Sequence, residues 1–127
     1  MAVALIFGLQ GVARAAETSA SITCDDSKKT LYVNASGVDY PGNINVEVVR
    51  EIFDNGKLRS SHETTVRTSS TGSWSVPRIE GTYKDTISKK ELKVRVYNAG
   101  GRELGRASDR CADFKDGEFD FRETAAA

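Results

Sequence analysis

Few side chains in this 127-residue sequence could carry chemistry, and its two cysteines come first among them. Cys24 and Cys111 lie near opposite ends of the chain, and with the single histidine, His62, they do not make up the ligand set of a metal site. In an exported chain of this size, two cysteines favour a disulfide. Such a bridge would enclose almost the whole domain and stabilise it by about 4–5 kcal/mol. Two buried thiols in a cytosolic protein are the alternative.

A catalytic relay of serine, histidine and acid would have to use His62, with Ser60 or Ser61 as its neighbour. Adjacent residues of a strand point to opposite faces, and the sequence has no nucleophile-elbow motif. We therefore expect His62 to be a solvated strand histidine. We expect no catalytic residue, metal or cofactor, and hence a protein that is not an enzyme.

Charge is balanced over the whole chain but segregated near its end. Lysine plus arginine and aspartate plus glutamate number 18 each, which disfavours nucleic acid as a partner. Residues 89–110 hold seven basic side chains against three acidic ones, whereas residues 113–123 hold five acidic against two basic. The basic segment predicts a face for an anionic ligand, carried by Lys93, Arg95, Tyr97, Arg102 and Arg106. Alternatively, the basic strands pair with the acidic tail.

The acidic tail, residues 113–127, has two further interpretations. Its carboxylates around Gly117 could bind calcium, with Asp25 and Asp26 close by across the disulfide, although the spacing departs from the EF-hand loop and a solvated tail is the simpler expectation. Its three phenylalanines could dock on the sheet.

Residues 1–16 differ from the rest of the chain. They are apolar, with Ala13 and Ala15 at the alternating small positions of a signal-peptidase site. We interpret them as the remnant of a signal peptide, which implies a secreted, periplasmic or cell-surface protein. An apolar first strand or buried helix is the alternative. The run is shorter than the ~20 residues of a membrane-spanning helix.

Residues 17–112 then form one domain of short, alternating β-type runs. Asn55-Gly56 predicts a type I′ turn between runs 44–53 and 58–68. Val49 interrupts the alternation of its run, so we expect a bulge or an exchange of faces there. About seven strands with regular turn signals predict an all-β antiparallel sandwich. Its expected core includes Trp74, Val46, Val48, Val94 and Val96.

Two short motifs carry weaker interpretations. Arg78, in the stretch 75–81, marks a bond that trypsin-like proteases would cut, and on an exposed loop it could act as an inhibitor; a solvated strand end is the simpler expectation. Asn34-Ala35-Ser36 is a glycosylation sequon, meaningful only in a eukaryotic source.

From residue 33 to residue 108 the chain resembles the immunoglobulin-like modules of bacterial exported and surface proteins. The residues that carry the resemblance are Gly37-x-x-Tyr40-Pro41-Gly42-x-Ile44-x-Val46-x-Val48, Asp54-Asn55-Gly56, the stretch 68–76 around Gly72-Ser73-Trp74, Gly81-Thr82-Tyr83 and the stretch 94–101. The resemblance implies an immunoglobulin-like sandwich in which Trp74 fills the space between the sheets. It also points to a bacterial source.

These observations together predict an exported, non-catalytic binding module, adhesive or inhibitory, that engages a protein or an anionic ligand such as a glycan outside the cell. A carbohydrate-binding module is one alternative; it needs a row of exposed aromatics, for which Tyr32, Tyr40, Tyr83 and Tyr97 are the candidates. A structural subunit of a larger extracellular assembly, joined through edge strands or the tail, is the other.

Overall fold

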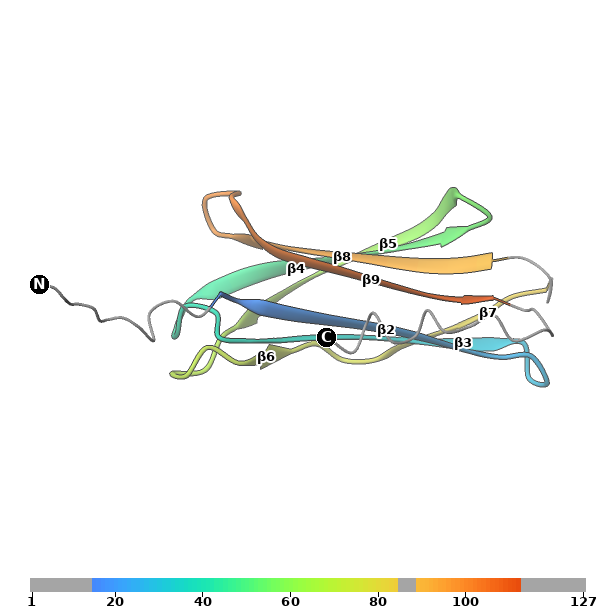
Figure 1. Cartoon of the computed structure of the whole chain (residues 1–127), viewed down its shortest axis with the longest axis horizontal. Helices are drawn as coiled ribbons and strands as arrows, with labels where there is room; N and C mark the ends of the chain where they lie inside the picture. Colours follow the sequence, from blue (N-terminus) through green and yellow to red (C-terminus); the bar gives the residue numbers. More distant parts are fainter. Residues whose placement is uncertain (1–14, 85–88, 113–127) are drawn as a thin grey trace, which may run out of the picture.

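The computed structural model describes residues 15–84 and 89–112, which form two β-sheets stacked face to face (Figure 1). This part of the chain contains no helix, and therefore none that could cross a membrane. The prediction of an all-β sandwich with one disulfide is confirmed. In chain order the strands are β2 (Glu17–Asp25), β3 (Thr30–Val38), β4 (Asn45–Asp54), β5 (Lys57–Arg67), β6 (Trp74–Ser75), β7 (Ile79–Thr82), β8 (Lys89–Asn98) and β9 (Glu103–Ala112).

All strand pairs are antiparallel. One sheet has the order β2-β3-β6, with β7 also paired to β3, and the other has the order β5-β4-β8-β9. The strands β6 and β7 pair with opposite ends of β3 and are separated by Pro77, which has no N–H to give to a ladder. Residues 15–84 and 89–112 therefore contain eight strands, where the sequence predicted about seven.

Alternation of side chains builds the core. Along β4 and β8 every second residue points into the space between the sheets, and Val46, Val48, Val94 and Val96 are all at most 1% exposed. Trp74 is buried between the sheets as well, with the ring of Tyr40 edge-on at 5.6 Å. The apolar faces of both sheets are removed from water in this way, which is the main force that holds such layers together.

The hairpin predicted from Asn55-Gly56 is present. Both residues have positive φ, 53° and 83°, as a type I′ turn requires, and β4 and β5 pair on either side of it. An asparagine followed by a glycine adopts these angles at little cost, so this short-range signal is reliable in isolation.

The bulge predicted at Val49 is wrong. The alternation continues through Val49, and the register shift falls between Ile52 and Phe53 instead. Arg50 is consequently directed inward and is only 2% exposed. Its Nη1 donates a hydrogen bond of 2.8 Å to the carbonyl oxygen of Pro77, across the interior. A long side chain with a backbone acceptor opposite thus occupies a core position.

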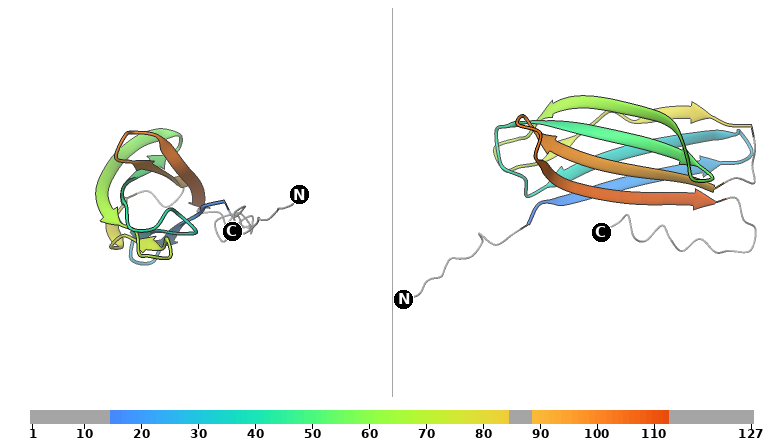
Figure 2. Two further views of the ribbon diagram at one scale, coloured as in Figure 1. Left: turned by 90° about the vertical axis from the view of Figure 1, so that its left-hand side faces the viewer. Right: turned by 90° about the horizontal axis from the view of Figure 1, so that it is seen from above.

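The two open sides of the sandwich differ. On one side β2 and β9 lie next to each other, as the views in Figures 1 and 2 show, without being paired as strands. Side chains close this seam: the Cys24–Cys111 disulfide joins the ends of β2 and β9, and Asp109 reaches from β9 to the backbone of β2. On the other side, β5 and β7 are the outermost strands of their sheets and remain apart.

Candidate functional site

Four of the five predicted ligand-binding residues lie on one surface. Lys93, Arg95 and Tyr97 point outward from β8, and Arg106 lies beside Arg95 on β9. We call these four side chains the basic face. Arg102 is outside it, exposed just before β9, where its backbone N–H donates to the side-chain oxygen of Asn98. Strand register, which the sequence alone could not supply, decides this grouping.

Carboxylates neutralise part of the basic face. Arg95 Nη1 lies 3.1 Å from Glu51 Oε1 on β4, and Arg106 binds both oxygens of Glu103 at 2.6 and 2.9 Å. This two-point contact lowers the pKa of Glu103 and raises the pKa of Arg106. Lys93 Nζ lies 4.9 Å from the centre of the Phe53 ring. The arrangement places cationic groups beside carboxylates and an aromatic ring on the outer face of β8 and β9.

The open side of the sandwich holds a cleft of about 620 Å³ between β5 and β7, which we call the β5–β7 cleft. Its apolar part consists of Leu31, Ile52 and Ile79, which belong to the core or pack against it. Its polar part includes acidic, basic and uncharged side chains from both sides of the cleft: Asp54, Arg59, Ser60, His62, Glu80, Thr82, Tyr83, Lys84 and Lys90. The sequence did not indicate this cleft, because its two walls are distant in the chain.

His62 lies on a strand, β5, as expected, and it is half-buried and lines the β5–β7 cleft. Ser60 lies on the same face of β5 and also lines the cleft, whereas Ser61 points the other way. Among the described residues, no hydrogen bond joins His62 to a serine or a carboxylate. Asp54, the nearest acid of the cleft in the sequence, is paired with Lys90 at 3.4 Å. The three residues therefore lack the contacts of a catalytic relay.

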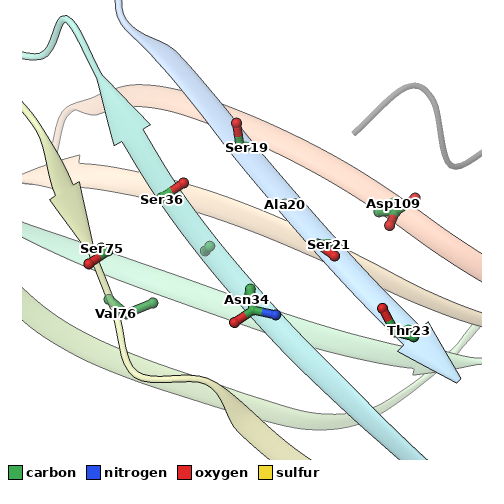
Figure 3. A pocket seen from close by; sticks show the side chains of 10 residues that line it. Ser19, Ala20, Ser21, Thr23, Asn34, Ser36, Ser75, Val76 and Asp109 are labelled. Carbon is green, nitrogen blue, oxygen red and sulfur yellow. The ribbon is translucent and has the colours of Figure 1, made fainter. Parts of the chain in front are cut away.

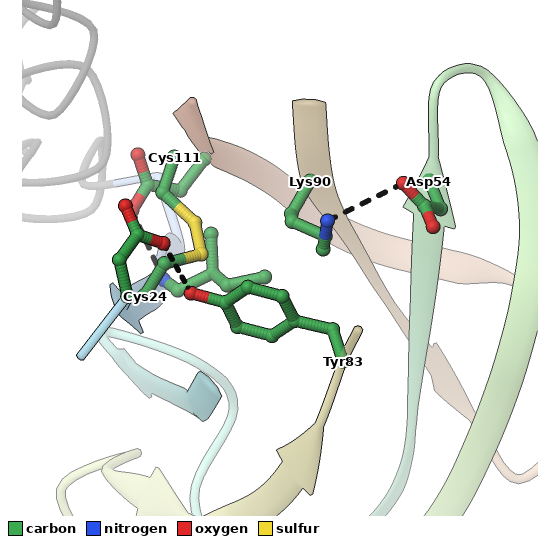
Figure 4. Close-up of a disulfide and its surroundings, with 8 residues drawn as sticks. Cys24, Asp54, Tyr83, Lys90 and Cys111 are labelled. Carbon is green, nitrogen blue, oxygen red and sulfur yellow. Dashed lines mark hydrogen bonds and ion pairs between the residues drawn. A yellow bond between two sulfur atoms is a disulfide. The ribbon is translucent and has the colours of Figure 1, made fainter. Parts of the chain in front are cut away.

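A polar network covers the disulfide end of the sandwich (Figure 4). Tyr83 donates a 2.6 Å hydrogen bond to Asp26, and the ammonium group of Lys90 lies 4.5 Å from the centre of the Tyr83 ring. Lys90 is only 3% exposed, and its ion pair with Asp54 links β8 to β4. Because Lys90 is also paired in register with Cys111, these contacts join the end of the cleft to the disulfide.

A second hollow, of about 490 Å³, lies on the outer face of the β2-β3-β6 sheet (Figure 3). We call it the hydroxyl groove, because hydroxyl and amide side chains line it: Ser19, Ser21, Thr23, Asn34, Ser36 and Ser75. Small polar residues at every second position of the sequence are the signal that could have revealed it. Asp109 lines its border, but its Oδ1 is buried and has no partner among the described residues, while Oδ2 accepts from Ile22.

The remaining candidates have structural roles or lie outside the described residues. Arg78 is exposed, and its guanidinium stacks 4.7 Å above the ring of Tyr32. Asp25 accepts hydrogen bonds from Ser27, which lower its pKa, and no cluster of three potential metal ligands occurs in residues 15–84 and 89–112. The signal peptide predicted in residues 1–16, apart from its last two residues, and the calcium site in the acidic tail fall outside this part of the chain.

The fold places this chain in the class of all-β, two-sheet sandwich domains, and comparisons with solved structures agree. Bacteroides uniformis β-glucuronidase matches over 75% of this chain, with a TM-score of 0.56 and 13% identity. A calcium-binding mutant of β-glucuronidase 2 from the same organism matches with the same TM-score and 14% identity. The match spans 13% of each of those chains, and at this identity it concerns the fold alone. No family model and no curated protein matches the chain.

Proposed function

We propose that this chain is a non-catalytic interaction module of an exported protein, of the immunoglobulin-like kind found in bacterial surface proteins, and that it binds an anionic protein or glycan through the basic face. The observation that carries the proposal is the position of Arg95 directly opposite Arg106 on neighbouring strands. Like charges in this arrangement destabilise a sheet. Glu51 and Glu103 each pair with one of the two guanidinium groups and offset part of this repulsion. The two positive groups held side by side on the outer face support binding of an anionic partner.

The surroundings support this role. The outward positions of β8 and β9 carry five basic side chains, Lys89, Lys93, Arg95, Arg106 and Arg110, against Glu91 and Glu103. Tyr97 adds a half-buried aromatic ring on the same face. The β-glucuronidases support a modular role too, because the sandwich that matches this chain is a small part of those proteins. The disulfide is typical of oxidising compartments, in keeping with export.

The alternative of a carbohydrate-binding module lacks the row of aromatics that it needs. Tyr40 is buried in the core, Tyr83 lies in the β5–β7 cleft, and Tyr97 is on the basic face. Tyr32 lies on the outer face of the other sheet beneath Arg78. The four rings therefore occupy four separate places and offer no common platform for stacking sugars.

The test is binding to immobilised heparin and to immobilised polyglutamate, a polyanionic glycan and a polyanionic peptide. The triple variant Lys93→Ala, Arg95→Ala, Tyr97→Ala should bind at least one of these tenfold more weakly than the unaltered chain, and raised salt should weaken binding of the unaltered chain.

A matched control removes the same residue types from other surfaces: Lys57→Ala, Arg67→Ala and Tyr32→Ala together. This variant has the same net charge as the first and should bind like the unaltered chain. Equal binding by both triple variants, with each shown to be folded by its thermal transition, contradicts the proposal. So does a folded, unaltered chain that binds neither polyanion.

A further inference from the structure

The edge of β5 lacks the features that block the other sheet edges of the sandwich. The edges of β2 and β9 are joined by the disulfide and by Asp109, which occupies the N–H of Ile22. The edge opposite β2 is divided between β6 and β7, which are two and four residues long and are separated by Pro77. In contrast, β5 has 11 residues and no proline, and within the described residues it pairs only with β4. A long edge of this kind is a template for a further strand.

Strand register shows which backbone groups of β5 point outward. Directly after β5, the N–H of Thr68 donates to the carbonyl oxygen of Ile44 at 2.8 Å. Peptide groups alternate in direction along an antiparallel ladder, and the β4–β5 register has no shift between residues 61 and 67. The N–H and C=O groups that face away from β4 are therefore those of Ser61, Glu63, Thr65 and Arg67.

The side chains of this stretch are complementary to those of a second copy of the chain. In an antiparallel pairing that is symmetric about Thr65, Glu63 of each copy lies directly opposite Arg67 of the other. Both charged side chains are exposed on the outer face of the sheet, where opposite charges on neighbouring strands attract. On the inner face, Val66 of each copy lies opposite Thr64 of the other, and both are partly buried β-branched residues, which pair well across strands.

Other symmetric registers fit less well. Symmetry about Glu63 places that carboxylate against its own copy, which is repulsive. Symmetry about Thr64 puts no opposite charge directly across from Glu63. Symmetry about Ser61 would include Arg59, which has no partner on β4 because the register shifts there, so the edge is irregular at that residue. The charge pattern and the regular part of β5 therefore select Thr65 as the centre.

We propose that two copies of this chain pair along β5 about a twofold axis at Thr65, so that their β5-β4-β8-β9 sheets become one continuous sheet. Such an interface uses the same surface of both copies. Because the axis is perpendicular to the sheet, the basic faces of the two copies lie on the same side of the dimer. The pairing itself uses a different surface from the basic face and does not depend on the proposed function.

Sedimentation velocity of the full chain over a series of concentrations tests this pairing. The unaltered chain should change from monomer to dimer as the concentration rises. Thr65→Pro should raise the dissociation constant of the dimer at least tenfold, because proline removes an outward N–H that β4 does not use. Thr65→Val keeps this N–H and is the matched control, which should dimerise like the unaltered chain. The thermal transition of each variant reports whether the sandwich is intact.

Charge reversal tests the register. Glu63→Arg and Arg67→Glu should each weaken the dimer at least tenfold, because each places like charges opposite one another. An equal mixture of these two variants should form heterodimers, and the double variant with both changes should dimerise like the unaltered chain. Arg59→Glu makes the same change of charge outside the paired stretch and should leave dimerisation unchanged.

Three results overturn the proposal. The first is an unaltered chain that stays monomeric at every concentration. The second is a dimer that a folded Thr65→Pro variant forms as tightly as the unaltered chain. The third is a mixture of Glu63→Arg and Arg67→Glu that forms no heterodimer. Because these measurements contain no polyanion, their outcome is separate from that of the binding tests on the basic face.

Discussion

Oδ2 of Asp109, on β9, accepts a 3.0 Å hydrogen bond from the backbone N–H of Ile22, on β2. The contact joins the edge strands of the two sheets, and Asp109 is only 6% exposed. An acidic side chain that occupies an edge N–H also prevents another strand from pairing there. Together with the disulfide, Asp109 therefore closes one side of the sandwich, while the β5–β7 side stays open.

Replacement of Asp109 by alanine should lower the free energy of unfolding by about 1.5–3 kcal/mol, because the buried Ile22 N–H loses its charged acceptor. Urea unfolding measures this change. Asp109→Asn is the matched control: it keeps an oxygen for Ile22 and should cost clearly less. Equal losses in the two variants would show that the hydrogen bond is not what stabilises the seam.

Removal of the disulfide should cost about 4 kcal/mol, since Cys24 and Cys111 are separated by 87 residues and the bridge restricts a long loop in the unfolded chain. The double variant Cys24→Ser, Cys111→Ser should show this loss in urea unfolding. Reduction of the unaltered chain with dithiothreitol should have a similar effect, and the same reagent should leave the double variant unchanged. A loss under about 1 kcal/mol would contradict the expectation.

Arg50→Met should leave the free energy of unfolding unchanged or raise it. Burial lowers the pKa of Arg50, and its Nε has no hydrogen-bond partner among the described residues, so the charge is poorly compensated. An apolar side chain of similar length avoids the desolvation of that charge. Arg50→Ala, which leaves a cavity, should instead destabilise by about 2–4 kcal/mol. Guanidinium chloride unfolding separates these outcomes; a Met variant as unstable as the Ala variant would refute the explanation.

Alkaline pH should destabilise the fold through Tyr40. Its ring is buried and its hydroxyl bonds with Thr18, and burial raises its pKa above the ordinary value near 10. In the unfolded chain Tyr40 ionises at the lower, ordinary pKa. Its contribution to stability is therefore complete below about pH 10 and is lost as the pH rises through the pKa of the folded state.

Unfolding free energies measured between pH 8 and pH 11 check this expectation. Tyr40→Phe should reduce the alkaline loss of stability, whereas Tyr97→Phe on the basic face should leave it in place. Identical pH profiles for the unaltered chain and Tyr40→Phe would exclude Tyr40 as the cause.

Local signals predicted much of the fold. The alternation around Val46 and Val94 identified the buried faces of β4 and β8, and Asn55-Gly56 identified the hairpin, because both effects operate over a few neighbouring residues. Arg50 shows where such reasoning fails. Its burial depends on the carbonyl of Pro77, 27 residues away, which no local pattern reveals.

By itself, the sequence determined an all-β chain and favoured a bridge between Cys24 and Cys111, since side-chain period, turn residues and the presence of two cysteines can be read without the fold. Only the tertiary structure decided which side chains meet. Strand register set Arg95 beside Arg106 and left Arg102 apart, and the stacking of the two sheets put His62 in a cleft with Gly81 and closed the opposite seam with Asp109. These contacts depend on the order of strands in space, which arises from the burial of whole sheet faces rather than from any short stretch of residues.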